Sequence, residues 1–269
     1  MTATLAARPP APTIGFPNLL RSELTKLRSV RSTWWTAVFA ALATIAVSVI
    51  ICVQWRSNLL SGKDSLDGFD ATLTSLNGLY LAQIAAGTLG VLVMSSEYGT
   101  GMIRATMAAV PQRRAVLAAK GVVFAGCTLL VGELLSFAGF AIGQAILSGA
   151  HASASLTDAD ALRATVGGGL YLTAVGLLGF GLGALIRHTA GALSAFFGIL
   201  FASTVVVDLL PTSWRNALID YMPANAGSQI LTTVPTHSAL GPWAGLGVLC
   251  GYAAAAIAVA TVLITRRDV

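Results

Sequence analysis

The stretch WWTAVFAALATIAVSVIICVQW, residues 34–55, contains no charged side chain. A helix of about 20 predominantly apolar residues crosses the hydrocarbon core of a bilayer. Trp34 and Trp35 stand at one end of the stretch and Trp55 at the other. Indole rings favour the two membrane–water interfaces. The stretch therefore predicts a transmembrane helix.

Five further apolar stretches of similar length follow along the chain. They cover about residues 71–94, 121–147, 164–186, 190–210 and 243–265. None shows the ten-residue alternating segments of a membrane barrel. Only 10% of the 269 residues are charged, against about 25% in a typical soluble domain. We predict an all-α polytopic membrane protein with six transmembrane helices.

The distribution of basic residues predicts the orientation of these helices. Of the 16 Lys and Arg residues, 12 fall on the side of the N-terminus, and the other four are Arg56, Lys63, Arg163 and Arg215. Cytoplasmic loops carry the excess of Lys and Arg. Both termini are therefore expected in the cytoplasm. The net charge of +5 is explained by topology, and no nucleic-acid partner is expected.

The segment before the first span divides into two parts. Residues 1–16 are rich in Pro and Ala and have no apolar core like that of a signal peptide, so we expect a disordered cytosolic N-terminus. Residues 17–31 place leucines at helical spacing, with basic residues and Glu23 opposite. This pattern predicts an amphipathic interface helix along the inner membrane surface, or a plain extension of the first span. Its candidate residues are Leu20, Glu23, Leu24, Leu27 and Arg28. Residues 32–269 form the transmembrane domain.

The connection between the second and third spans reads SSEYGTGMIRATMAAVPQRR, residues 95–114. Ile103 and Met107 share one face of a short helical pattern, while Arg104 projects elsewhere. Pro111 is expected to end this helix. Such a segment can dock its apolar face in the groove of a partner, or it can be a solvated connector whose arginines only set the topology. The flanking candidates are Glu97, Gly101, Arg113 and Arg114.

Three carboxylates lie in or beside the predicted spans. Glu133 falls near the middle of the third span, where a charge costs about 2.5–3.5 kcal/mol on insertion scales. It should face a cavity or a partner, either as a proton relay or through an interhelical hydrogen bond. Glu97 is interpreted as a structural ion-pair hub, within reach of Arg104 or the N-terminal helix. Asp208, near the outer end of the fifth span, is interpreted as interfacial.

The sequence contains none of the motifs of nucleotide-binding, hydrolase or metal sites considered below. The string Gly62-Lys63-Asp64 lacks the spaced glycine and the Ser or Thr of a nucleotide-binding Walker A loop. The patterns H-E-x-x-H and G-x-S-x-G are also absent. The three cysteines and three histidines show no metal-ligand spacing. We expect no enzymatic activity, cofactor or metal in this chain.

Three G-x-x-x-G pairs lie within the predicted spans. Such pairs permit close approach of two membrane helices, within one chain or between chains. The pairs are Gly139 with Gly143, Gly179 with Gly183, and Gly247 with Gly251.

Several segments resemble the type-2 family of ATP-binding-cassette (ABC) permeases, in particular its six-helix actinobacterial subunits. They are RSELTKLRSVRSTWW (21–35), SSEYGTGMIRATMAAVPQRRAVLAAK (95–120), YMPANAG (221–227), LGPWAGLGVLCGY (240–252) and the terminal RRDV. Their order matches that family over most of the chain. One departure is Gly101-Met102, where the family most often has Gly-Thr before Ile-Arg.

The resemblance implies a permease subunit of an exporter in the bacterial plasma membrane. Its substrate would be an amphipathic or hydrophobic compound. A separate ATPase subunit would bind ATP and Mg, and the short helix between the second and third spans would be the coupling helix that contacts it. A second permease subunit, identical or homologous, would complete the pathway within the membrane lipid. The alternatives are a self-contained secondary transporter or channel, and a membrane-embedded assembly or sensor protein.

Overall fold

The computed structural model describes residues 15–29, 31–102, 112–235 and 239–266, and these residues form helices and connecting turns without a strand. In this part of the chain, six helices are long and apolar enough to cross a membrane. The predicted number of spans and the all-helical class are confirmed. The chain is therefore described as a multi-pass membrane protein. The six spans are α2 (Arg31–Leu60), α4 (Leu79–Gly99), α6 (Arg113–Leu147), α7 (Ala159–Ile186), the α8–α9 unit and α12 (Pro242–Arg266).

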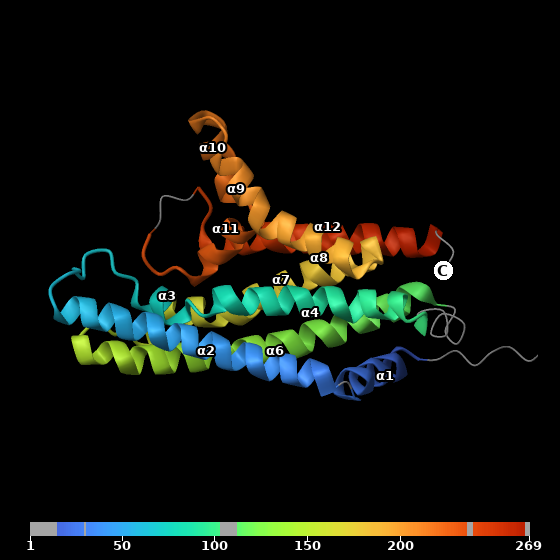
Figure 1. Ribbon diagram of the computed structural model, residues 1–269, viewed down its shortest axis with the longest axis horizontal. Coiled ribbons are helices and arrows are strands. Elements are labelled where there is room, and N and C mark those ends of the chain that lie inside the picture. Colours follow the sequence, from blue (N-terminus) through green and yellow to red (C-terminus); the bar gives the residue numbers. More distant parts are fainter. Residues whose placement is uncertain (1–14, 30, 103–111, 236–238, 267–269) are drawn as a thin grey trace, which may run out of the picture.

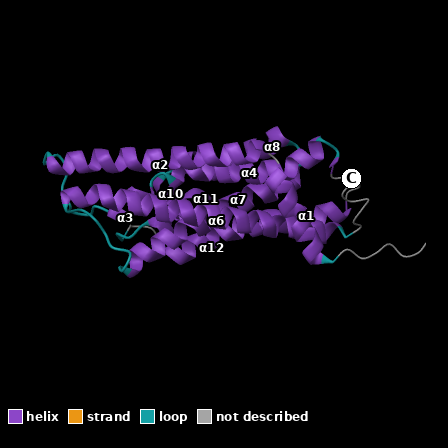
Figure 2. Ribbon diagram, turned by 90° about the horizontal axis from the view of Figure 1, so that it is seen from below, coloured by secondary structure: helices purple, strands orange, loops and turns teal. Residues whose placement is uncertain are grey.

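The long helices run along a common axis (Figures 1 and 2). Helix α1 (Phe16–Ser29) and the C-terminal end of α12 lie at one end of the bundle, called the α1 end below. Helix α3 (Ala71–Leu76) lies at the opposite end, called the α3 end. The fifth span is composite: α8 (Thr189–Phe197) continues through the π-helical segment η2 (Gly198–Ala202) into α9 (Ser203–Asp208). Figure 1 shows α9 and α10 (Thr212–Leu218) projecting from the bundle.

Helix α7 is the core of the bundle and packs against α4, α6 and α12. Glycines allow its close approach to α4. A Cβ atom on Gly179 would lie 2.2 Å from the carbonyl oxygen of Gly87, and one on Gly183 would lie 2.7 Å from that of Val91. This G-x-x-x-G pair therefore serves packing within the chain. In contrast, no described residue outside the adjacent backbone of α12 has an atom within 4 Å of the ideal Cβ position of Gly247.

The second predicted span, residues 71–94, is wrong at its start. Helix α3 ends at Leu76, and α4 begins at Leu79. The break is at Gly78, whose backbone N–H donates to Ser48 Oγ of α2 at 3.1 Å. A Cβ atom on Gly78 would lie 2.1 Å from the carbonyl oxygen of Thr44, so a glycine is required for α2 to pack this closely.

Two charged side chains hold the chain segment before α12 at the α3 end. This segment comprises η3 (Ile219–Tyr221), α11 (Pro223–Ser228), η4 (Gln229–Leu231) and the residues up to 235. The Asp70 carboxylate caps α3 through Leu73 N and accepts hydrogen bonds from Thr233 N, Thr233 Oγ1 and Val234 N. Arg163 donates to the carbonyl oxygens of Ile230 and Thr232. Asp70 and Arg163 thus fasten the segment to α3 and α7.

Candidate functional site

The candidate site lies at the α1 end, where α1 packs against the first turns of α6. Leu19 of α1 is buried together with Val116 and Ala119 of α6. Leu20 packs against the edge of this contact. The apolar contact aligns α1 with α6 and directs the next turn of α1 towards the end of α4.

Four charged side chains meet in that space. We call Glu23, Lys26, Glu97 and Lys120 the charge cluster. The Lys120 ammonium lies 2.5 Å from Glu23 Oε2 and 2.8 Å from Glu97 Oε1. Lys26 lies 2.7 Å from Glu23 Oε1 and 3.4 Å from Glu97 Oε1. The cluster therefore joins α1, α4 and α6.

The cluster is balanced in charge and largely shielded from solvent. Glu23, Glu97 and Lys120 are each 5% exposed. Burying charges away from water is costly unless their partners are well placed, and removal of one partner then leaves the other uncompensated. Two carboxylates and two ammonium groups balance the charge, while Glu97 Oε2 is buried without a hydrogen-bond partner among the described residues. The ion pairs hold the three helices against one another.

The pKa values of the α1 groups reflect this pairing. Burial opposes ionisation of Glu23, but the ammonium groups of Lys120 and Lys26 more than offset it and hold the pKa of Glu23 below 4.5. Burial also opposes the charge of Lys26, while Glu23 and Glu97 raise the pKa of Lys26 above 10.5. Both groups are consequently charged at neutral pH.

The end of α4 is also fastened on a second side. The guanidinium of Arg187 lies over the ring of Tyr98, 5.2 Å from its centroid. Thr189 Oγ1 donates to Ser95 Oγ at 2.9 Å. These contacts join α4 to the turn between α7 and α8. Two residues beyond the end of α4, Gly101 has a positive φ of 72°, which suits a glycine.

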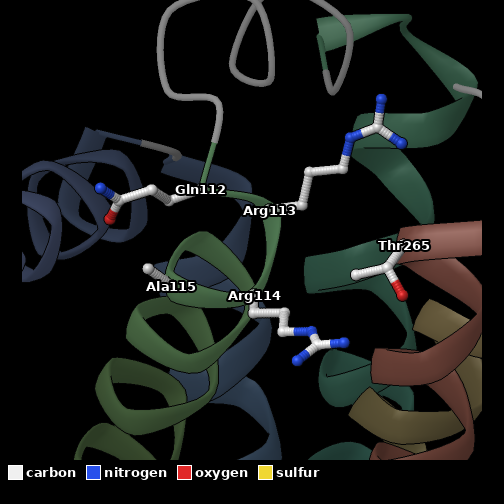
Figure 3. A pocket seen from close by; sticks show the side chains of 5 residues that line it. All are labelled: Gln112, Arg113, Arg114, Ala115 and Thr265. Carbon is white, nitrogen blue, oxygen red and sulfur yellow. The ribbon is translucent and has the colours of Figure 1, made fainter.

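The start of α6 contacts the end of α12. Arg113 Nη1 donates to the carbonyl oxygen of Ile264 at 3.3 Å. A cavity of about 440 Å³ lies beside this contact. Figure 3 shows Arg113 and Arg114 extending from the start of α6 on the side that faces Thr265 of α12. Gln112 and Ala115 also line the cavity. The two ends of the segment between α4 and α6 are therefore both anchored to the bundle.

The structure brings some of the predicted site residues together and leaves others apart. Glu97 takes part in ion pairs, as expected, with Lys26 of the N-terminal helix and also with Lys120. Gly101, Arg113 and Arg114 flank the predicted coupling helix. Ile103, Arg104, Met107 and Pro111 lie outside the described residues, so the coupling helix and an ion pair of Glu97 with Arg104 stay predictions.

The placement of Glu23 on the solvent-facing side of the N-terminal helix is wrong. Glu23 is buried, whereas Arg28 is exposed and Leu24 and Leu27 are half-buried. Glu23 lies four residues after Leu19, so the helical period puts it on the face that packs against α6. Lys120 compensates its charge there. Sequence reasoning missed Lys120 as a site residue and counted it only for topology. Its position, one turn or more inside an apolar helix, was the available signal.

The other two carboxylates lie away from the cluster. Asp208, at the end of α9, accepts from Arg215 Nε at 2.8 Å, and both side chains are exposed. Glu133 lies in the middle of α6. Its Oε2 atom is buried without a hydrogen-bond partner among the described residues. The interhelical hydrogen bond considered for Glu133 is therefore not present at that oxygen.

No protein-family model matches the chain, and no curated protein matches its sequence. The function is therefore argued from the sequence and from the geometry above.

Proposed function

We propose that this chain is the transmembrane permease subunit of an ABC exporter in the bacterial plasma membrane. Six spans and the resemblance of several segments to type-2 ABC permeases support this proposal. The exported compound would be amphipathic or hydrophobic. Because the sequence has no Walker A loop, a separate ATPase subunit would bind ATP and Mg and supply the energy.

The charge cluster is the observation that carries the proposal. It holds α1 and α6 against the last turn of α4, so both ends of the segment of residues 100–112 are anchored to the same buried ion pairs. A displacement of that segment by a partner would move α1, α4 and α6 together. Rigid elements that share a packed network transmit displacement in this way. A solvated connector has no need of such an anchor.

The proposal assigns the α1 end to the cytoplasm. The coupling surface would comprise Ile103, Arg104 and Met107, between Glu97 and Pro111. Arg113 and Arg114 would add charged contacts at its rim, where such residues mainly affect association rate and specificity. A second permease subunit, identical or homologous, would complete the pathway.

The proposal is tested by coexpression with an ATPase subunit encoded beside the gene. The purified single chain should show no ATPase activity, and the two chains should copurify. Replacing both Ile103 and Met107 with Asp should abolish copurification, because burying an unpaired carboxylate in an apolar groove costs several kcal/mol. The control is Met102→Asp, with thermal stability of each variant measured in detergent.

A self-contained secondary transporter is the second candidate, and Glu133 is the observation that favours it. A carboxylate in the middle of a membrane helix, with Oε2 buried and without a hydrogen-bond partner among the described residues, suits a proton relay. Substrate transport by the lone chain in proteoliposomes, driven by a proton gradient, would favour this candidate over the ABC permease.

A further inference from the structure

Glu133 occupies the centre of the longest helix. It lies 13 residues after Lys120 of the charge cluster and 14 residues before Leu147, where α6 ends. At about 1.5 Å per residue, both distances are about 20 Å. The carboxylate is therefore far from both ends of the bundle.

Helix α7 has a depression that receives this carboxylate. A Cβ atom on Gly169 would lie 2.5 Å from both Cδ and Oε1 of Glu133, so a larger residue there would displace the carboxylate from this position. The nearby Thr173 hydroxyl donates to the carbonyl oxygen of Gly169. Among the described residues, Glu133 Oε2 is buried without a hydrogen-bond partner.

No counter-charge is close to Glu133 in the described part of the spans. The basic residues of these helices with described side chains lie towards the helix ends; they are Arg56, Arg113, Arg114, Lys120, Arg163 and Arg266. Lys120 is already paired with Glu23 and Glu97. An ionised carboxylate in a low-dielectric environment is costly without a partner. A cation brought by a ligand would supply that partner.

The surface beside Glu133 is apolar. Leu130 and Phe137, three residues before and four residues after Glu133, share its side of α6. They are 62% and 37% exposed, respectively. A ligand at this position would therefore need a hydrophobic body as well as a positive charge.

We propose that Glu133, with Leu130 and Phe137, forms a binding site for hydrophobic organic cations. The proposal rests on the proposed export function and specifies its substrate class. The carboxylate would bind the cationic centre, and the two apolar side chains would contact the hydrophobic body. Gly169 would set the depth at which the carboxylate lies.

The test uses purified chain in lipid nanodiscs and two ions of matched shape. Tetraphenylphosphonium carries a positive charge, and tetraphenylborate carries a negative one. Saturable tetraphenylphosphonium binding to the wild-type chain is expected. Glu133→Gln, which keeps the size and removes the charge, should raise its Kd by about tenfold or more. The same substitution should not weaken binding of tetraphenylborate.

Two controls separate charge from folding. Asp208→Asn removes a carboxylate that is exposed and paired with Arg215, and it should leave the Kd for tetraphenylphosphonium unchanged. Gly169→Ala displaces the carboxylate without removing it and should also weaken binding, so the proposal remains testable if Glu133→Gln does not fold.

Three results would overturn the site. The first is absence of saturable tetraphenylphosphonium binding to the wild-type chain. The second is an unchanged Kd for tetraphenylphosphonium in Glu133→Gln, and the third is equal weakening of the binding of both ions in that variant. The measurement requires no ATPase subunit. Its failure would therefore leave the copurification test of the proposed function intact, and failure of copurification would leave the binding result intact.

Discussion

The Lys120 ammonium lies 2.5 Å from Glu23 Oε2, although 97 residues separate the two in the chain. Glu97 Oε1 accepts from the same ammonium at 2.8 Å. One lysine inside an apolar helix thus bridges carboxylates from two other helices. The position of α1 against the bundle depends on this contact.

Replacing Lys120 with Met should therefore destabilise the chain by about 3–5 kcal/mol, because it leaves two buried carboxylates with one partially exposed lysine. Lys26→Met is the matched control. The Lys26 side chain is 32% exposed, whereas that of Lys120 is 6% exposed, so solvent already screens the ion pairs of Lys26 and its loss should cost less than the loss of Lys120. Thermal or denaturant unfolding in detergent measures both. Equal losses for the two variants would contradict the central role of Lys120.

Stability should depend on pH through the same cluster. Because the pKa of Glu23 is below 4.5 in the folded chain, its stabilisation is complete above pH 4.5 and is lost as pH falls through the lower folded value. The raised pKa of Lys26 affects stability at alkaline pH. Its contribution is complete below pH 10.5 and is lost as pH rises through the higher folded value.

The thermal midpoint of unfolding in detergent, measured as a function of pH, tests the predicted loss of stability at acid pH. The difference between the wild-type chain and Glu23→Gln should be constant near neutral pH and should shrink below pH 4.5. A difference that stays constant through the acid range would show that Glu23 is not stabilised by its charge.

Asp70→Asn should release the segment before α12 at the α3 end. The carboxylate accepts four hydrogen bonds, three of them from Thr233 and Val234. Asn offers one acceptor atom and one donor group, so some of these bonds must be lost. Hydrogen bonds to a charged group contribute about 1.5–3 kcal/mol each.

Hydrogen exchange with mass spectrometry should show faster exchange in peptides covering residues 229–235 of this variant, with no change in α1. Asp208→Asn is the control, since Asp208 pairs with Arg215 on an exposed surface. Unchanged protection of residues 229–235 in Asp70→Asn would mean that the segment is held without the Asp70 carboxylate.

Gly179→Ala and Gly247→Ala form a matched pair within G-x-x-x-G sequences. A methyl group on Gly179 would lie 2.2 Å from the backbone oxygen of Gly87, so α4 and α7 must separate. We expect a loss of about 1–3 kcal/mol or more. Gly247 has open space around its Cβ position, and alanine there should be neutral or stabilising by up to about 1 kcal/mol.

Unfolding of the isolated chain in detergent compares the two glycine variants. If Gly247→Ala is harmless in that measurement but reduces association of two permease chains, α12 is an intermolecular surface. A large loss in the isolated chain would instead place a neighbour of the same chain against Gly247.

The proposed orientation is tested by labelling single cysteines in a cysteine-free background. Position 102 should be protected from an impermeant thiol reagent in intact cells, and positions 67 and 225 should be labelled. The reason is the excess of Lys and Arg on the side of the N-terminus. Labelling of position 102 from outside would reverse the topology and remove the basis for a cytosolic coupling segment.

The sequence by itself determined the membrane class and the number of spans. Each span is a local property, because about 20 consecutive apolar residues suffice to identify it. The helical N-terminal segment was predictable for the same reason: its leucine spacing lies within four turns. The ion pairing of Glu97 was also predictable, since a carboxylate at the end of an apolar helix needs a partner.

Tertiary structure alone decided which partner each charge has and which glycines are packed. Helical spacing puts Glu23 on the same face as Leu19 and Leu27, four residues before and after it, but only the fold brings Lys120 to this carboxylate from 97 residues away. Gly179 is in contact and Gly247 is open, although both belong to the same sequence pattern. Sequence periodicity defines the faces of one helix, whereas burial of a charge or a glycine depends on the distant helix that packs against that face.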